Sequence, residues 1–261
     1  MLIKGVFFDL YGTILIPKNN KKAWNNWLST FYRLMKNNGL NLSKRDFANV
    51  CNGFFTREEP IEKDKNLTIY ENRIRRFALD LSLELETHEI KKIANDCVNS
   101  WHKYVKIDPE ALPLLRILRI NKALALISNF DHPPYLYSIL SKYKLKKYFK
   151  FIAISGEIGV KKPDPQIFHI TLEKFELKPQ EVVYIGDSKE DIEGALNTGI
   201  KPILIQRQSF KKRLIGNDYY SKSVVKVKAR ENINQYLKIK PFKTISRLKE
   251  LYKILDLKKA S

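Results

Sequence analysis

The 261-residue sequence has few cysteines, no long apolar run and no leader-like N-terminus. Its two cysteines, Cys51 and Cys97, form no CxxC motif, zinc-binding pattern or disulfide framework. No apolar stretch approaches the roughly 18 residues that a transmembrane helix requires. The first apolar run is interrupted by Asp9 and lacks a small-residue cleavage site, unlike a signal peptide. We therefore expect a cytoplasmic protein with reduced thiols and no membrane partner.

Acidic residues are scarce relative to basic ones, which gives a net charge of +20. Residues 201–261 contain 17 Lys and Arg against 4 Asp and Glu. Such a segment is able to bind nucleic acid or another polyanion. Two explanations need no such partner: an AT-rich genome enriches Lys, Asn and Ile, and a positive field attracts small phosphorylated substrates. Because RGG runs, zinc-finger spacing and RNP-like motifs are absent, nucleic acid is the less favoured partner. Oligomeric state stays open.

Five short apolar runs rich in Val, Ile and Phe predict buried β-strands. They are Ile3–Phe8, Leu124–Ser128, Phe151–Ser155, Val182–Ile185 and Pro202–Ile205. Helical patterns separate the later runs, at Pro134–Tyr143, Asp164–Phe175 and Asp191–Thr198. Near-continuous apolar strands that alternate with helices are typical of a parallel sheet covered on both faces. The sequence therefore predicts an α/β fold.

A helical insert is predicted between the first two strands, over residues 16–107. Apolar residues recur there at intervals of three and four, as in Trp24, Trp27, Leu28, Phe31, Leu34 and Met35. Similar patterns cover residues 44–54, 68–81 and 87–104, and we expect the aromatic stripe to be helix core. We predict a core domain of residues 1–15 and 108–261 and a helical domain of residues 16–107. After residue 205, Val224–Val227 predicts a short strand and Thr244–Leu257 an amphipathic helix.

Polar residues suited to catalysis follow four of the predicted strands in turn. They are Asp9; Ser128 and Asn129; Lys161 and Lys162; and Asp187 and Asp191. Ligands of open parallel sheets bind outside the carboxyl ends of the strands. Each residue alone has an ordinary explanation as a helix cap or turn residue. Four such strand ends in order predict a single site.

The segments FFDLYGT, LISNF, KKPDPQIF and YIGDSKED resemble, in this order, the four motifs of the haloacid dehalogenase superfamily. The motif-bearing core covers residues 1–13 and about 108–206. The helical insert occupies the place of that superfamily's commonest cap domain. The resemblance implies a hydrolase with a Rossmann-like core and an inserted α-helical cap. It is specific for the superfamily and says little about the substrate.

The resemblance also implies roles for individual residues. Asp9 is expected to attack as a carboxylate nucleophile and to form a covalent intermediate. Ser128 would hydrogen-bond the transferring group, and Lys162 would neutralise its charge. Further substrate contacts are expected from Tyr11, Thr13 and Asn129.

A Mg²⁺ site is implied by the GDxxxD form of the fourth motif. Asp187 and Asp191 would hold the ion together with Asp9 and the main-chain carbonyl of Tyr11. Mg²⁺ prefers a few carboxylates, phosphate oxygens and water. Its charge would let an anionic nucleophile approach an anionic phosphoryl group.

Tyr11 departs from the phosphatase pattern. Phosphatases of this superfamily usually carry a second Asp there, which protonates the leaving oxygen and then activates water. A phenol with a pKa near 10 is a poor general base at neutral pH. The 2-haloacid dehalogenases also carry Tyr at this position, because halide needs no proton. Their fourth motif, however, typically lacks the first acid, whereas GDSKED keeps both.

Three hypotheses follow. We favour a Mg²⁺-dependent phosphohydrolase that forms an aspartyl-phosphate intermediate from a small phosphorylated metabolite, with a preference for good leaving groups such as acyl or aryl phosphates. The first alternative is a metal-independent 2-haloacid dehalogenase, for which Arg33, Arg45 and Arg57 are carboxylate-binding candidates by residue type only. The second is a non-catalytic protein of the same fold that binds a polyanion or nucleic acid through its basic C-terminal region.

Overall fold

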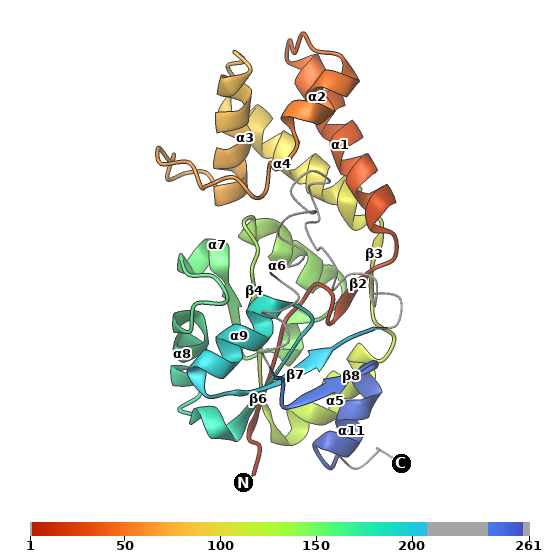
Figure 1. The fold of residues 1–261 in the computed structure, drawn as a ribbon, viewed down its shortest axis with the longest axis vertical. Helices are drawn as coiled ribbons and strands as arrows, with labels where there is room; N and C mark the ends of the chain where they lie inside the picture. Colours follow the sequence, from red (N-terminus) through yellow and green to blue (C-terminus); the bar gives the residue numbers. More distant parts are fainter. Residues whose placement is uncertain (1, 208–239, 258–261) are drawn as a thin grey trace.

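Six short parallel strands organise the computed structural model, which describes residues 2–207 and 240–257. They are β1 (Gly5–Phe8), β4 (Ala123–Ser128), β5 (Phe151–Ile154), β6 (Val182–Gly186), β7 (Lys201–Ile205) and β8 (Lys243–Ile245). Their order in the sheet is β5-β4-β1-β6-β7-β8, so β1 lies inside the sheet between β4 and β6 (Figure 1). The predicted α/β fold with a parallel sheet is confirmed.

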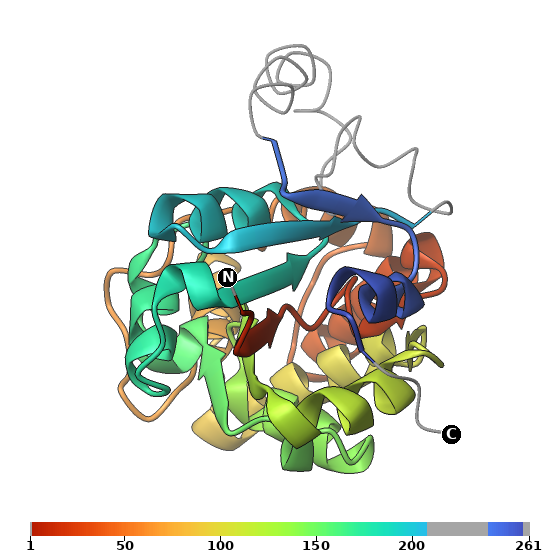
Figure 2. The same cartoon turned by 90° about the horizontal axis from the view of Figure 1, so that it is seen from below.

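Helices cover both faces of this sheet (Figure 2). One side carries α5 (Ala111–Asn121), α6 (Pro133–Lys142) and α11 (Leu251–Ile254), and the other carries α7 (Ser155–Ile158), α8 (Gln166–Glu173) and α9 (Lys189–Thr198). Successive residues of β1 point to opposite sides. Phe8 belongs to the apolar cluster that includes Leu118 of α5, whereas Phe7 belongs to the cluster that includes Phe168 of α8. This double coverage explains why the strands are apolar at consecutive positions.

Four helices between β1 and α5 form a separate layer, which Figure 1 shows beyond one end of the sheet. They are α1 (Asn20–Asn37), α2 (Lys44–Val50), α3 (Ile69–Asp80) and α4 (Thr87–His102). An antiparallel pair, β2 (Leu15–Pro17) and β3 (Val105–Ile107), joins the chain segments that enter and leave this layer. Among the described residues, no helix is both long and apolar enough to cross a bilayer.

Most of the predicted apolar stripe of α1 is buried in the core of the helical layer, whereas Trp24 and Leu28 are half-buried against it. Phe31 is fully buried, and its ring contacts the rings of Trp27, Phe47, Phe54 and Phe77 at centroid distances of 5.1–5.6 Å. These partners come from α1, α2, α3 and the segment between α2 and α3. One ring therefore links most of the layer.

The structure differs from the prediction at the C-terminal end. Thr244–Leu257, predicted as one helix, begins within strand β8, continues as a 3₁₀ turn (Leu248–Glu250) and becomes helical only at α11. Parallel pairing of β8 with β7, from Ile203–Lys243 to Ile205–Ile245, overrides the helical periodicity. The predicted strand Val224–Val227 lies outside the described residues. The three-residue strands β2 and β3 are too short to leave a sequence pattern.

The central position of Phe31 predicts a large loss of stability on truncation. Phe31→Ala should lower the free energy of unfolding by about 3–5 kcal/mol, because it removes buried contacts and leaves a cavity. Leu79→Ala, at a half-exposed position of α3, is the control and should cost less than about 1 kcal/mol. Urea denaturation followed by circular dichroism measures both. Equal losses would contradict the central role of Phe31.

Candidate active site

The ends of β1, β4 and β6 bring most of the predicted site residues together. Asp9 follows β1, and its N–H donates to the carbonyl of Ile185 in β6 (2.8 Å). Ser128 is the last residue of β4, beside β1, and is buried. Asp187 follows β6, and Asp191 lies in the first turn of α9. The carboxyl ends of parallel strands thus gather the acids at one edge, as the sequence predicts.

The buried ammonium of Lys162 links these elements. Its Nζ lies 2.7 Å from Asp9 Oδ1 and 2.6 Å from Asp191 Oδ1. It also lies 3.0 Å from Tyr184 Oη and 3.1 Å from the carbonyl of Ile127. Since only 4% of Lys162 is exposed, its charge is compensated almost entirely by these protein groups. Tyr184, a core residue of β6 that sequence reasoning missed, is part of this arrangement.

The protonation of this cluster follows from burial and charge. Burial raises the pKa of Asp9 to about 7, although Lys162 acts in the opposite direction. Burial opposes the charge of Lys162, yet Asp191 and Asp9 raise its pKa above the ordinary value. Burial also opposes ionisation of Asp191, but Lys162 and several hydrogen bonds hold its pKa below the ordinary value. One ammonium group therefore balances the charges of two carboxylates. Additional positive charge nearby would lower the pKa of Asp9 and favour its ionised form.

The carboxylates of Asp191 and Asp9, which both contact Lys162, differ in how many hydrogen bonds they accept. Asp191 Oδ1 accepts from Lys162 and Tyr184, and its Oδ2 accepts from the N–H groups of Asp187 (3.1 Å) and Ser188 (3.0 Å) and from Ser188 Oγ (2.9 Å). By contrast, Asp9 Oδ2 is buried and has no hydrogen-bond partner among the described residues. Oxygens of Asp9, Asp187 and Asp191 lie within 4.8 Å of one another. This oxygen-rich set fits a hard divalent cation.

Two glycines make room for these acids. Gly12 has φ +95°, and a Cβ there would lie 2.0 Å from Asp187 Oδ2. A Cβ at Gly186 would lie 2.4 Å from the Cβ of Asp191. Contacts this short do not occur, so any larger residue would displace a carboxylate. The glycines of the first and fourth motifs are therefore part of the site's geometry.

Tyr11 lies among aromatic rings rather than in the Lys162 cluster. Its ring stacks on Phe130 (5.4 Å between centroids) and meets Trp101 of α4 edge-on (5.2 Å). Its hydroxyl is buried without a hydrogen-bond partner in the described part of the chain. Burial, reinforced by Tyr135 and Tyr143, raises the pKa of Tyr11 well above its ordinary value. The phenol is thus an even weaker acid than free tyrosine.

Of the other two predicted substrate contacts, the Asn129 side chain has partners, whereas the Thr13 hydroxyl is buried with no hydrogen-bond partner in the described part of the chain. The Asn129 amide donates to the carbonyl of Lys162 and accepts from its N–H, both at 2.9 Å. Thr13 is fully buried, and its carbonyl accepts from Arg207 (2.8 Å). Arg207, which sequence reasoning missed, also forms an ion pair with Asp108 (2.6 Å). It therefore ties the loop after Asp9 to the segment that follows β3.

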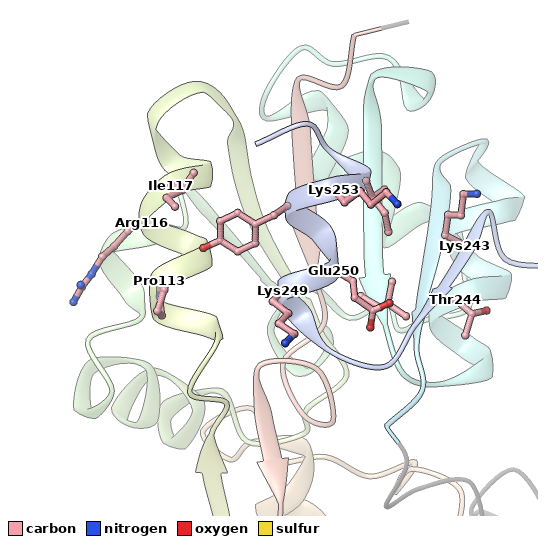
Figure 3. A pocket seen from close by; sticks show the side chains of 11 residues that line it. Pro113, Arg116, Ile117, Lys243, Thr244, Lys249, Glu250 and Lys253 are labelled. Atoms are coloured by element: carbon pink, nitrogen blue, oxygen red, sulfur yellow. The ribbon is translucent and has the colours of Figure 1, made fainter. Parts of the chain in front are cut away.

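A wide basic groove lies elsewhere on the core, between α5, β8 and α11 (Figure 3). It has a volume of about 1180 Å³. Its basic lining residues in the described part of the chain are Arg116, Lys243, Lys249 and Lys253, beside the acid Glu250. None of the predicted catalytic or metal-binding residues lines it.

The sequence matches the family model described as haloacid dehalogenase-like hydrolase over residues 3–199. It is 35% identical to a phosphoserine phosphatase of Thermus thermophilus over 101 residues, which are 38% of this chain and 40% of that protein. It is 30% identical to a phosphorylated carbohydrates phosphatase of Thermotoga maritima over 131 residues, which are 48% of this chain and 58% of that protein. The matches thus span less than two thirds of the length of these relatives.

Two solved structures share the fold over nearly their whole length. A HAD phosphatase from Thermococcus onnurineus superposes with a TM-score of 0.63 at 22% identity, covering 99% of this chain and 100% of the other. A 2-haloacid dehalogenase from Pseudomonas syringae pv. Tomato superposes with a TM-score of 0.60 at 19% identity, covering 98% and 99%. Because both activities occur on this fold, the fold alone does not choose between them.

The close approach of Gly12 to Asp187 predicts a specific loss of cation binding. Gly12→Ala should weaken Mg²⁺ binding at least about 10-fold, because the new methyl group displaces the Asp187 carboxylate. Gly159→Ala is the matched control: Gly159 has a similar positive φ of +82°, but a Cβ at that position would have no atom within 4 Å. Isothermal titration calorimetry with Mg²⁺ measures both variants. Equal weakening of Mg²⁺ binding in both variants would show that backbone strain, and not displacement of Asp187, causes the effect.

Proposed function

The chain belongs to the haloacid dehalogenase-like hydrolases, and we propose that it is a Mg²⁺-dependent phosphohydrolase that acts through an aspartyl-phosphate intermediate. One observation carries the proposal. Asp9 presents a buried oxygen without a partner among the described residues, while its other oxygen is fixed by Lys162 and two further carboxylates stand close by. A nucleophile surrounded by acids suits an anionic substrate only when a cation is also bound.

Each of these residues has a separate role in the proposed reaction. The Asp9 carboxylate attacks phosphorus and forms the acyl phosphate, while the leaving oxygen departs with the bonding electron pair. Lys162 fixes the orientation of Asp9 and contributes positive charge beside the transferring group. Ser128, at the adjacent strand end, would donate a hydrogen bond to a phosphoryl oxygen. Water then hydrolyses the acyl phosphate and regenerates Asp9.

The proposed Mg²⁺ would be held by Asp9, Asp187 and the main-chain carbonyl of Tyr11, with Asp191 completing the acidic set. Bound there, the ion would supply charge neutralisation between nucleophile and phosphate. Since both oxygens of Asp191 already accept hydrogen bonds, we assign Asp191 chiefly to holding Lys162 and the turn before α9. Asn129 likewise positions Lys162, through its backbone.

We further propose that residues 16–107 act as a cap over the site. The antiparallel pair β2–β3 provides the two connections, and Arg207 braces them through Thr13 and Asp108. Contacts between the layers include polar ones, such as the Arg73–Asp131 ion pair (3.2 Å). Such an interface suits a cap that opens for substrate entry and product release.

The alternatives have separate support. Tyr11 favours a dehalogenase, but Asp187 occupies the position of the first acid, which the fourth motif of metal-independent dehalogenases typically lacks. The basic groove around Lys249 is the feature that favours polyanion binding, together with the net charge of residues 201–261. Neither alternative explains why Asp187 lies close to Asp9 and Asp191.

The central test is hydrolysis of p-nitrophenyl phosphate with Mg²⁺ and with EDTA. We expect Mg²⁺-dependent release of nitrophenolate that falls at least about 1000-fold in Asp9→Asn, because the nucleophile is removed. Asp80→Asn, which changes an exposed acid of α3, is the control and should keep full activity.

Other outcomes would favour the alternatives. Chloride release from L-2-chloropropionate that EDTA does not affect would indicate the dehalogenase. Inactivity toward both substrates, combined with salt-sensitive nucleic-acid binding, would indicate the non-catalytic protein.

The environment of Tyr11 predicts that its hydroxyl is dispensable. Tyr11→Phe should change kcat for p-nitrophenyl phosphate by less than about 3-fold, because the hydroxyl donates to no described group and is a weak acid. Steady-state kinetics measure the effect. A loss above about 100-fold would show that the phenol transfers a proton and would contradict this assignment.

A further inference from the structure

A second cavity, of about 220 Å³, lies between the helical layer and the loop after β4. Its aromatic lining residues are Trp24, Trp27, Phe55, Tyr70, Trp101 and Phe130. They include all three tryptophans of the chain. The proposed reaction uses none of these aromatic rings. A cavity lined by so many rings indicates a binding site for a ligand that aromatic side chains recognise.

The rings are held in fixed positions by one another. Trp24 stacks on Trp27 (4.8 Å between centroids, 14° between planes), and Phe55 stacks on Tyr70 (5.7 Å, 15°). Trp27 Nε1 donates to Tyr70 Oη at 2.8 Å and joins the two pairs. A wall fixed before binding loses little side-chain entropy when a ligand arrives. It therefore favours a flat partner that stacks on or meets these rings edge-on.

The charges at the cavity favour a neutral ring over a cation. Aromatic cages for quaternary ammonium groups gain from an available negative charge. Here Asp131, which supplies the carboxylate among the described lining residues, is engaged by Arg73 at 3.2 Å. Lys161 adds positive charge at the same cavity, and burial lowers the pKa of the lining residue His132, which favours its neutral form.

The cavity is lined in part by residues that are next in sequence to the proposed catalytic residues. Asn129 and Phe130, which line it, directly follow Ser128, and the lining residue Lys161 directly precedes Lys162. Tyr11, two residues after Asp9, stacks on Phe130. A group esterified to a phosphate at Asp9 would therefore extend toward the aromatic wall.

We propose that this cavity receives the aromatic leaving group of an aryl phosphate monoester, an assignment that rests on the proposed phosphohydrolase function. Apolar cavities of about 150 Å³ hold benzene, so the available volume suits one ring with a small substituent. On attack by Asp9 the O–P bond forms, the P–O(aryl) bond breaks, and the phenolate leaves with the electron pair and takes a proton from water. A phenolate needs no protein acid to depart, which agrees with Tyr11 at the position of the usual Asp.

Binding to the Asp9→Asn variant tests the assignment without turnover. With Mg²⁺ present, phenyl phosphate should bind on the order of 30-fold more tightly than methyl phosphate, the effect of burying one phenyl group. It should also bind several-fold more tightly than cyclohexyl phosphate, which has similar size but no aromatic ring. Tryptophan fluorescence reports the event, since every tryptophan lines the cavity. Calorimetry gives the dissociation constants.

A matched pair of substitutions localises the effect. Phe55→Leu, added to Asp9→Asn, should reduce the preference for phenyl over methyl phosphate at least about 3-fold, because one ring of the wall is lost. Phe242→Leu changes a half-exposed phenylalanine outside the cavity and should leave the preference unchanged. Retained binding of methyl phosphate shows that the phosphate site of each variant is intact.

The outcomes separate this inference from the function on which it rests. Equal affinity for phenyl and methyl phosphate would overturn the aromatic assignment and leave the phosphohydrolase intact. Tighter binding of phosphocholine than of phenyl phosphate would assign the cavity to a cation instead. Failure to bind any of these esters would overturn both proposals.

Discussion

The buried ammonium of Lys162, held between Asp9 and Asp191, is the interaction on which the rest of the site depends. Removing a charge from water is costly, so the cation requires close carboxylates and neutral acceptors around it. Those acceptors come from the ends of β1 and β4, from the middle of β6 and from the start of α9. Satisfying one charge thus fixes elements that are as much as 153 residues apart in sequence.

The same requirement makes stability and function inseparable at this site. Two carboxylates compete for one ammonium, Gly12 and Gly186 allow backbone and carboxylate to approach closely, and Asp9 keeps an oxygen without a partner in the described part of the chain. Each feature costs stability and is tolerated where the surrounding fold determines it. A bound cation and phosphate would supply the missing charge and hydrogen-bond partners. The proposed complex would therefore satisfy polar groups that have no partner among the described residues of the free protein.

Much of this arrangement could be predicted from the sequence because the determining patterns are local. Buried strands such as Val182–Ile185 are apolar at every position, and the polar residues follow at the strand ends. What could not be predicted depends on contacts between distant segments. Strand β8 exists because β7 offers an edge, Tyr184 joins the site from the interior of a strand, and Arg207 acts through Asp108. None of these has a local signature.

Tyr11 connects the two halves of the functional argument. In the sequence it is a missing acid, which leaves a phosphohydrolase dependent on leaving groups that depart unprotonated. In the structure the same side chain stacks on Phe130 and meets Trp101, so it links the loop of the nucleophile to the aromatic wall of the helical layer. An Asp at this position would bury a carboxylate among these rings. The cost of desolvating its charge would be offset only by a cation or by hydrogen-bond donors close to it. If the proposed function holds, Tyr11 both replaces the usual acid and contributes a ring to the surface that would receive leaving groups able to depart unprotonated.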